Sequence, residues 1–151
     1  MVELRPVDRT AVSVLASAEA CEAVAGAATD YTVCRVAPDE ILLVGEPGDG
    51  TSTSAAAEPA AGPDALVLDV TDGWTAWELR GPDAREAFAR LSELELPHEG
   101  SAQGEVARLP VKILVGAGAI TLLVPAMWGE YLRERILTDC RAVGVTEVVS
   151  S

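Results

Sequence analysis

The 151-residue sequence predicts an α+β fold in which helices cover one face of an antiparallel sheet. Short runs of β-branched and apolar residues, separated by turn-forming residues, recur along the chain and are typical of strands. A few segments instead carry apolar residues at the three- and four-residue spacing of a helix. Hydrophobic residues make up 49% of the sequence and aromatic residues only 4%, so we expect a sizeable and mainly aliphatic core.

Residues 1–44 predict a small βαββ lobe. Residues 11–16 alternate as a strand does, and Ser17 caps a helix that has acidic residues in its first turns. Residues 31–37 and 40–45 are rich in β-branched and apolar residues and predict two further strands, with Pro-Asp at the turn between them.

Residues 45–63 predict a flexible linker. The segment is dense in Gly, Pro, Ser, Thr and Ala and has no apolar periodicity, so it offers little surface to bury against a core. It separates the first lobe from residues 64–151, and we expect the two lobes to form one structural unit.

Residues 64–151 predict the order β, α, β, β, α, β, which is the split βαβ or ferredoxin-like arrangement. Residues 65–70 and 75–81 form one bent strand or two strands. The other expected strands are a hairpin at residues 111–115 and 119–124, and a final strand at residues 145–149.

Two helices are expected in this second lobe. The first begins at the sequence Gly-Pro-Asp, where proline loses no needed hydrogen bond and aspartate complements the helix N-terminus. The second begins after Pro125 and ends at Gly144. Their apolar stripes are Ala84, Ala87, Phe88, Leu91 and Leu94 in the first, and Trp128, Leu132, Ile136, Cys140 and Val143 in the second.

The charge of the chain disfavours nucleic acid and membrane partners. Eleven basic and 24 acidic residues give a formal net charge of −13, which repels phosphate backbones and anionic lipid. The longest apolar stretch, residues 113–124, is interrupted by glycines and too short to cross a bilayer. Cys21, Cys34 and Cys140 are widely spaced, as in a cytoplasmic protein with buried thiols.

The sequence predicts no catalytic, cofactor-binding or metal-binding residue. The sequence has a single histidine, His98, and a histidine-based relay or a histidine-rich metal site cannot be assembled around it. The glycines at residues 116–118 join two strands and do not open a helix, so they do not match a phosphate-binding loop.

Two aspartates near the first tryptophans have two interpretations. Asp69 and Asp72 are expected to cap the turn at Gly73, and the alternative is a carboxylate pair that shares a proton or binds a cationic substrate. Capping is the preferred interpretation, because short polar side chains at such turns commonly hydrogen-bond the backbone.

The tryptophans divide into core and surface. Trp74 and Trp77 are three residues apart in an extended segment, so they point to opposite faces of the sheet. We assign Trp77 to the core together with Phe88 and Trp128. Trp74 is the expected partner-facing ring, and Leu137 is the second expected interface residue.

Most of the chain resembles the gamma subunit of heterotetrameric sarcosine oxidase, a family related to the folate-binding aminomethyltransferase domains of the glycine cleavage system. The resemblance is carried by "RVAPDEILLVG", "VLDVTDGWTAWELRGPDAREAFARL", "LELPHEGSAQGEVARLPVKILV" and "ITLLVPAMWGEYLRERI". It implies a non-catalytic small subunit of a complex that oxidises N-methylated amines. It also implies that flavin, NAD and folate are bound by larger partner subunits and that this chain binds no cofactor.

Two other classes of function remain open. One is a stand-alone folate or small-ligand binding domain of the aminomethyltransferase type, for which Asp69 or Glu78 would hold the pterin ring. The other is a ferredoxin-like regulatory module that binds an amino acid, which rests on fold analogy alone.

Overall fold

The computed structural model describes residues 1–27, 30–47 and 57–149, and it confirms the α+β class. The chain forms two compact units. One consists of Met1–Val7 and Gly73–Ser151 and is called here the six-stranded unit; the other, Asp8–Asp72, is called the four-stranded unit. Each is described by itself.

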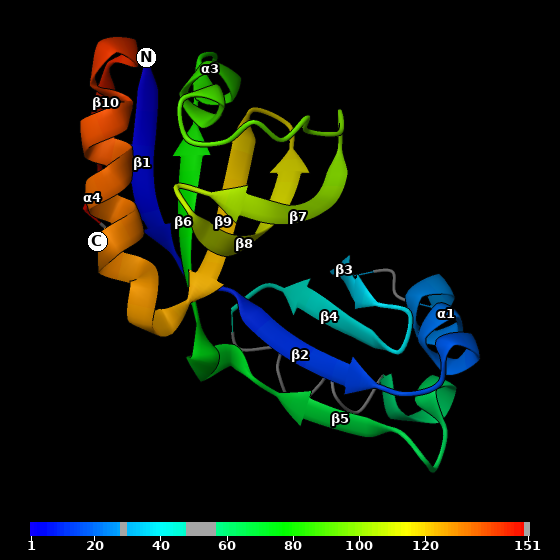
Figure 1. The fold of residues 1–151 in the computed structure, drawn as a ribbon. Helices are drawn as coiled ribbons and strands as arrows, with labels where there is room; N and C mark the ends of the chain where they lie inside the picture. Colours follow the sequence, from blue (N-terminus) through cyan, green and yellow to red (C-terminus); the bar gives the residue numbers. More distant parts are fainter. Residues whose placement is uncertain (28–29, 48–56, 150–151) are drawn as a thin grey trace. The chain divides into compact units, whose positions relative to one another are not determined.

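The six-stranded unit contains one mixed sheet with the strand order β10-β1-β6-β9-β8-β7 (Figure 1). All neighbouring strands are antiparallel except β1 and β10, which are parallel. The strands are β1 Val2–Val7, β6 Trp74–Arg80, β7 Gly100–Val106, β8 Leu109–Gly116, β9 Ala119–Pro125 and β10 Val145–Glu147.

The predicted split βαβ order is present in this unit as β6, α3, β8, β9, α4 and β10. Two strands were not predicted: β1 inserts between β10 and β6, and β7 adds to the edge beyond β8. Both have weak strand patterns, because β1 mixes charged residues and a proline with its apolar residues, and β7 carries two glycines and few apolar side chains.

Helices α3, Ala84–Ala89, and α4, Gly129–Asp139, cover the same face of the sheet (Figure 1). Alternate residues of the strands point toward these helices, as the two-residue period of a strand requires. Together they form one aliphatic core with Phe88 and Trp77 as its large aromatic members. The sequence-based assignment of these two rings to the core is confirmed.

The predicted helical stripes are largely buried, with one error. Leu132, Ile136 and Cys140 lie in the core, but Trp128 is 42% exposed. Trp128 belongs to a 3₁₀ turn, Ala126–Trp128, which precedes α4. A 3₁₀ turn has three residues per turn, so extending the 3.6-residue helical period back to Trp128 assigned its ring to the wrong side.

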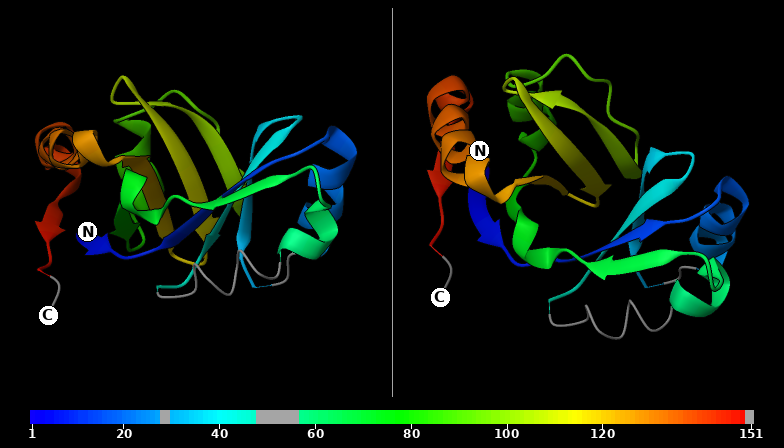
Figure 2. Two further views of the ribbon diagram at one scale, coloured as in Figure 1. Left: turned by 90° about the horizontal axis from the view of Figure 1, so that it is seen from below. Right: turned by 60° about the horizontal axis from the view of Figure 1, so that its bottom comes forward.

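The four-stranded unit is an antiparallel sheet with the order β3-β4-β2-β5. Its elements are β2 Thr10–Leu15, α1 Ala18–Ala27, β3 Thr32–Ala37, β4 Glu40–Gly45 and β5 Leu66–Asp69. Ser17 caps α1 as predicted, because its hydroxyl oxygen accepts a hydrogen bond from the Ala20 amide at 3.1 Å. Figure 2 shows α1 and a short helix at residues 57–61 beside each other, and both contribute to one core.

The unit boundaries differ from the predicted division at residues 44 and 64. Residues of β1 pair with β6, so the N-terminal strand belongs to the six-stranded unit. Residues of β5 pair with β2, so the strand predicted at 65–70 belongs to the four-stranded unit. Residues 2–7 were not predicted as a strand, and the strand predicted at 65–70 was assigned to the wrong lobe because a local pattern does not specify which strand it pairs with.

The predicted linker at residues 45–63 is also corrected in part. Residues 57–61 are helical, and Ala57 and Ala61 are buried in the core of the four-stranded unit. Residues 48–56 lie outside the described part of the chain. Alanines are small enough to pack closely on a sheet, and composition alone did not distinguish them from linker residues.

We predict that Trp77→Ala lowers the free energy of unfolding by about 3–5 kcal/mol, because it leaves a large cavity in the core. Trp77→Phe should cost about 1–2 kcal/mol, since it keeps most of the ring but leaves the Gly129 carbonyl without its 2.9 Å hydrogen bond. Denaturant unfolding of the three proteins measures both effects. Equal and small losses for the two variants would contradict the core assignment.

We also predict that Ala61→Asp destabilises the chain by about 2 kcal/mol or more, because it buries a carboxylate in an apolar cluster. Glu58→Gln, on the exposed side of the same short helix, is the control and should change stability little. Denaturant unfolding is again the measurement. An unchanged midpoint for Ala61→Asp would show that the 57–61 helix does not contribute to the core.

Candidate functional site

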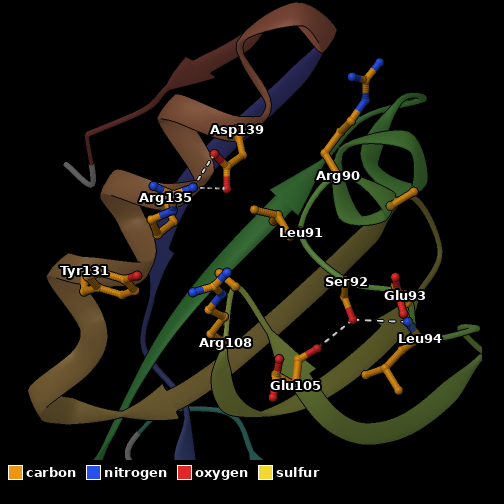
Figure 3. Close-up of a pocket in the computed structure, with 12 residues that line it drawn as sticks. Arg90, Leu91, Ser92, Glu93, Leu94, Glu105, Arg108, Tyr131, Arg135 and Asp139 are labelled. Carbon is orange, nitrogen blue, oxygen red and sulfur yellow. Dashed lines mark hydrogen bonds and ion pairs between the residues drawn. The ribbon is translucent and has the colours of Figure 1, made fainter.

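An open groove of about 920 Å³ lies on the helix-bearing side of the six-stranded unit (Figure 3). Three segments line it: the chain that follows α3, the β7–β8 turn, and α4. Its lining residues are Ala89, Arg90, Leu91, Ser92, Glu93, Leu94, Glu105, Ala107, Arg108, Tyr131, Arg135 and Asp139.

The β7–β8 turn has a strained backbone. Val106 pairs with Leu109, so Ala107 and Arg108 form a two-residue hairpin loop, and both have positive φ, 50° and 68°. Positive φ at both positions is the type I′ pattern, which strongly favours Asn-Gly because other side chains crowd the backbone there. The turn is held in place by a hydrogen bond from the Ala107 amide to the Leu91 carbonyl at 2.8 Å.

The wall opposite α4 is fixed by Ser92. Its hydroxyl donates to the Glu105 carbonyl at 2.7 Å and accepts a hydrogen bond from the Leu94 amide at 3.2 Å. The Leu94 side chain fills the space over Gly104, where an added Cβ would approach Leu94 Cδ1 to 2.6 Å. The segment after α3 is therefore anchored on β7.

The arginines around the groove differ in what they contact. Arg135 donates two hydrogen bonds to Asp139, at 2.6 and 2.7 Å, and this contact raises the pKa of Arg135. Both bonds come from Nη2. The guanidinium groups of Arg90 and Arg108 have no hydrogen-bond or ion-pair partner among residues 1–27, 30–47 and 57–149.

Figure 3 shows how these side chains are directed. Arg108 extends from the β7–β8 turn toward the face of α4 that carries Tyr131 and Arg135, whereas Arg90 points away from them. Leu91 lies between the arginine side chains. The guanidinium groups of this arrangement can bind an anion. The lining residues include neither a histidine nor a cysteine, the side chains most used as a general base or nucleophile at neutral pH.

The structure also places the two residues predicted to lie at an interface. Trp74 begins β6 opposite Pro125 and is half-buried, on the face of the sheet opposite to Trp77. Leu137 is half-buried and packs against the core between the sheet and the helices. The two residues therefore lie on different faces of the sheet and do not form one patch. Their role at an interface stays a prediction.

An exposed apolar cluster at the start of α4 was not predicted. Met127 is 80% exposed, and Trp128 and Tyr131 are each 42% exposed. The rings of Trp128 and Tyr131 meet edge to face, with centroids 6.2 Å apart and an interplanar angle of 75°. The sequence did contain a signal, because Trp128 and Tyr131 are bulky residues three positions apart at the start of the helix. The signal was missed because Trp128 was assigned to the core.

Two of the three carboxylates considered in the sequence analysis, Asp69 and Glu78, have side-chain partners. Asp69 accepts hydrogen bonds from the Thr71 hydroxyl at 2.6 Å and the Thr71 amide at 3.0 Å, and these bonds lower its pKa. This contact agrees with the capping interpretation, while Asp72 is exposed. Glu78 is buried and forms an ion pair with Arg80 at 2.7 Å. Asp69 and Glu78 belong to different compact units.

The three cysteines are free and buried, as expected, whereas His98 is exposed. The Cys140 thiol donates a hydrogen bond to the Ala87 carbonyl at 3.2 Å, and burial raises its pKa to about 11. Burial also raises the pKa of Cys21. Among the described residues, no three histidine, cysteine or acidic side chains are grouped as a metal site would require.

Comparisons with known proteins reveal similarity of fold. No protein-family profile and no curated protein sequence matches this chain. One chain of the heterotetrameric sarcosine oxidase from Corynebacterium sp. U-96, solved in complex with pyrrole 2-carboxylate, aligns with a TM-score of 0.77 and 21% identity. That alignment covers 97% of this chain and 87% of the other.

Two further solved structures are less similar. The glycine cleavage system aminomethyltransferase T from Bartonella henselae aligns with a TM-score of 0.71 and 17% identity, and 97% of this chain covers 47% of that enzyme. The ligand-free regulatory subunit of aspartate kinase from Thermus thermophilus aligns with a TM-score of only 0.49 at 15% identity. The chain thus has an aminomethyltransferase-like fold and spans about half the length of the Bartonella enzyme.

No helix in the described ranges is both long and apolar enough to cross a bilayer.

We predict that the Cys140 thiol makes stability fall at high pH. The unfolded thiol ionises near its ordinary pKa of 9.0, whereas the folded thiol stays protonated up to about pH 11. The stabilisation is therefore complete below pH 9 and is lost as the pH rises to about 11. Chemical denaturation from pH 7 to 11 should show a shallower decline for Cys140→Ala than for the parent chain. Parallel curves would contradict the prediction.

Proposed function

We propose that this chain is a non-catalytic small subunit of a heteromeric, flavin-dependent complex that oxidises N-methylated amines, like heterotetrameric sarcosine oxidase. The observation that carries the proposal is the alignment with one chain of that heterotetramer over 87% of the other chain's length. The same fold accounts for only 47% of the aminomethyltransferase. The alignment therefore covers most of a separate subunit but only about half of the transferase.

On this proposal the larger partner subunits bind flavin, NAD and folate, and this chain binds none of them. Its own contribution is to assembly. The exposed apolar cluster of Met127, Trp128 and Tyr131 supports such a role, because large exposed aromatic side chains are enriched at the energetic centres of interfaces. Trp74 and Leu137 remain proposed interface residues on other surfaces. A cytoplasmic location is also part of the proposal, and the three free thiols support it.

The second candidate is a stand-alone small-ligand binding domain. The groove between the β7–β8 turn and α4 favours it, since its volume of about 920 Å³ is within the range of small-molecule sites. The two candidates differ in what accompanies the chain in the cell, and the first is preferred because the fold match extends over nearly a whole subunit.

We predict that the tagged chain, purified from its native host, brings down a larger polypeptide with the absorption spectrum of bound flavin. The captured complex should oxidise sarcosine and release hydrogen peroxide, while the isolated recombinant chain should show no flavin band. The double variant Met127→Ser, Trp128→Ser should lower recovery of the complex at least tenfold, as expected when a hot spot of about 2 kcal/mol or more is removed. Mass spectrometry and visible spectroscopy are the measurements.

The control for that experiment is Val149→Ser, which removes an apolar side chain that is 84% exposed and should leave recovery unchanged. Trp74→Ala tests the other proposed surface and should weaken assembly without lowering the unfolding midpoint. Capture of a flavoprotein with equal yield by all variants would contradict the assignment of the interface. Purification of the chain alone, without a flavoprotein, would contradict the subunit proposal itself.

A further inference from the structure

We propose that the groove between the β7–β8 turn and α4 binds a small carboxylate with an apolar body, and that Arg108 and Arg135 hold the carboxylate. The inference goes beyond the proposed function, because it concerns a ligand of this chain itself and does not require partner subunits. It rests on the backbone of the turn, on the free donors of the two arginines and on the apolar floor of the groove.

The turn is built in a way that stability alone does not explain. Ala107 and Arg108 have φ values of 50° and 68°, which disfavour side chains larger than that of glycine. A glycine at position 108 would relieve this strain. Non-glycine residues in such conformations concentrate at functional sites, where the side chain serves a purpose other than folding. In this turn the retained side chain is an arginine that extends into the groove (Figure 3).

The donors of the two arginines are available. Arg108 has no hydrogen-bond or ion-pair partner in the described part of the chain. Arg135 uses only Nη2 on Asp139, so Nε and Nη1 are left for another acceptor within the same described ranges. The guanidinium of Arg135 contacts Asp139 on α4, and that of Arg108 extends toward the same helix (Figure 3), so an anion between the β7–β8 turn and α4 would lie near both positive charges. A carboxylate fits this role because it accepts two parallel hydrogen bonds from a guanidinium.

The charge balance of the groove favours a singly charged anion over a phosphate. Its lining contains the cations Arg90, Arg108 and Arg135 and the anions Glu93, Glu105 and Asp139, so these charges cancel. A carboxylate adds one negative charge to the site, whereas a phosphate adds up to two in a chain whose net charge is already −13. A singly charged ligand is therefore better tolerated than a phosphate.

The rest of the groove suits an apolar or flat body. Leu91, Leu94 and Ala107 are buried or half-buried at its floor, and each also contacts the main core. Tyr131 lies at the α4 side and is 42% exposed. A carboxylate on an aromatic ring would place its charge between the arginines and its ring against these side chains. Benzoate is the simplest probe of this class.

The test is titration of the ¹⁵N-labelled full chain with benzoate at constant ionic strength, with neutral benzamide as the reference compound. We expect saturable shifts confined to residues 89–94, 105–109 and 131–139, and none from benzamide. Arg108→Gln should weaken benzoate binding at least fivefold. Arg141→Gln makes the same charge change at an exposed arginine outside the groove and should leave binding unchanged.

Arg108→Gly separates the ligand role from a folding role. It should abolish the benzoate shifts while leaving the melting temperature equal to that of the parent chain or higher, because glycine suits the positive φ. A lower melting temperature would overturn the argument from turn strain. Equal responses to benzoate and benzamide, shifts scattered outside the groove, or equal weakening by Arg141→Gln would overturn the carboxylate site.

Discussion

The attachment of α4 to β6 is the contact on which the surface features of the six-stranded unit depend. The Trp77 indole donates a hydrogen bond to the carbonyl of Gly129, the first residue of the helix, at 2.9 Å. Gly129 lies so close to the strand that an added Cβ would approach Thr75 Cγ2 to 2.8 Å. Helix and sheet are thus locked at a distance that only glycine permits. Trp128 and Tyr131, on either side of this point, are consequently held outside the core.

The distribution of charge is the second constraint. Ion pairs with acidic side chains are formed by Arg5, Arg35, Arg80, Arg133 and Arg135. On neighbouring strands β1 and β6, Glu3 lies opposite Arg80 and Arg5 lies opposite Glu78, so the pairs form a small lattice across the ladder. Opposite charges in such positions stabilise a sheet modestly. Among the described residues, the side chains of Arg90 and Arg108 have no such acidic partner, and both line the groove.

The sequence predicted which segments form helices and strands better than it predicted which strands pair with one another. The strands of the hairpin, the capped first helix and the burial of Trp77 and Phe88 follow from local periodicity, because each depends on residues close in the chain. The places of β1 and β5 depend on pairing across many residues, and nothing in their own patterns specifies it. The 3₁₀ turn before α4 reversed the expected side of Trp128, since one short turn shifts the helical phase.

The groove could not be predicted from the sequence for a similar reason. Arg108 and Arg135 are 27 positions apart, and they share a space only because β8, β9 and the start of α4 return the chain to the same side of the sheet. The turn was also not recognisable, because Ala-Arg is an uncommon sequence for a type I′ hairpin. Such a departure from local preference is visible only when the backbone angles are known, and it is then informative about function.

The groove and the exposed apolar cluster at the start of α4 share one residue, Tyr131. Tyr131 lines the groove, and its ring packs edge to face on Trp128. A ligand in the groove would therefore contact the same ring that supports the exposed apolar cluster. The surfaces are nevertheless separable, because Arg108 comes from the β7–β8 turn and Met127 and Trp128 come from the turn before α4. A change confined to Arg108 leaves the cluster intact, so failure of the carboxylate site would say nothing against the subunit, and loss of assembly would say nothing against the site.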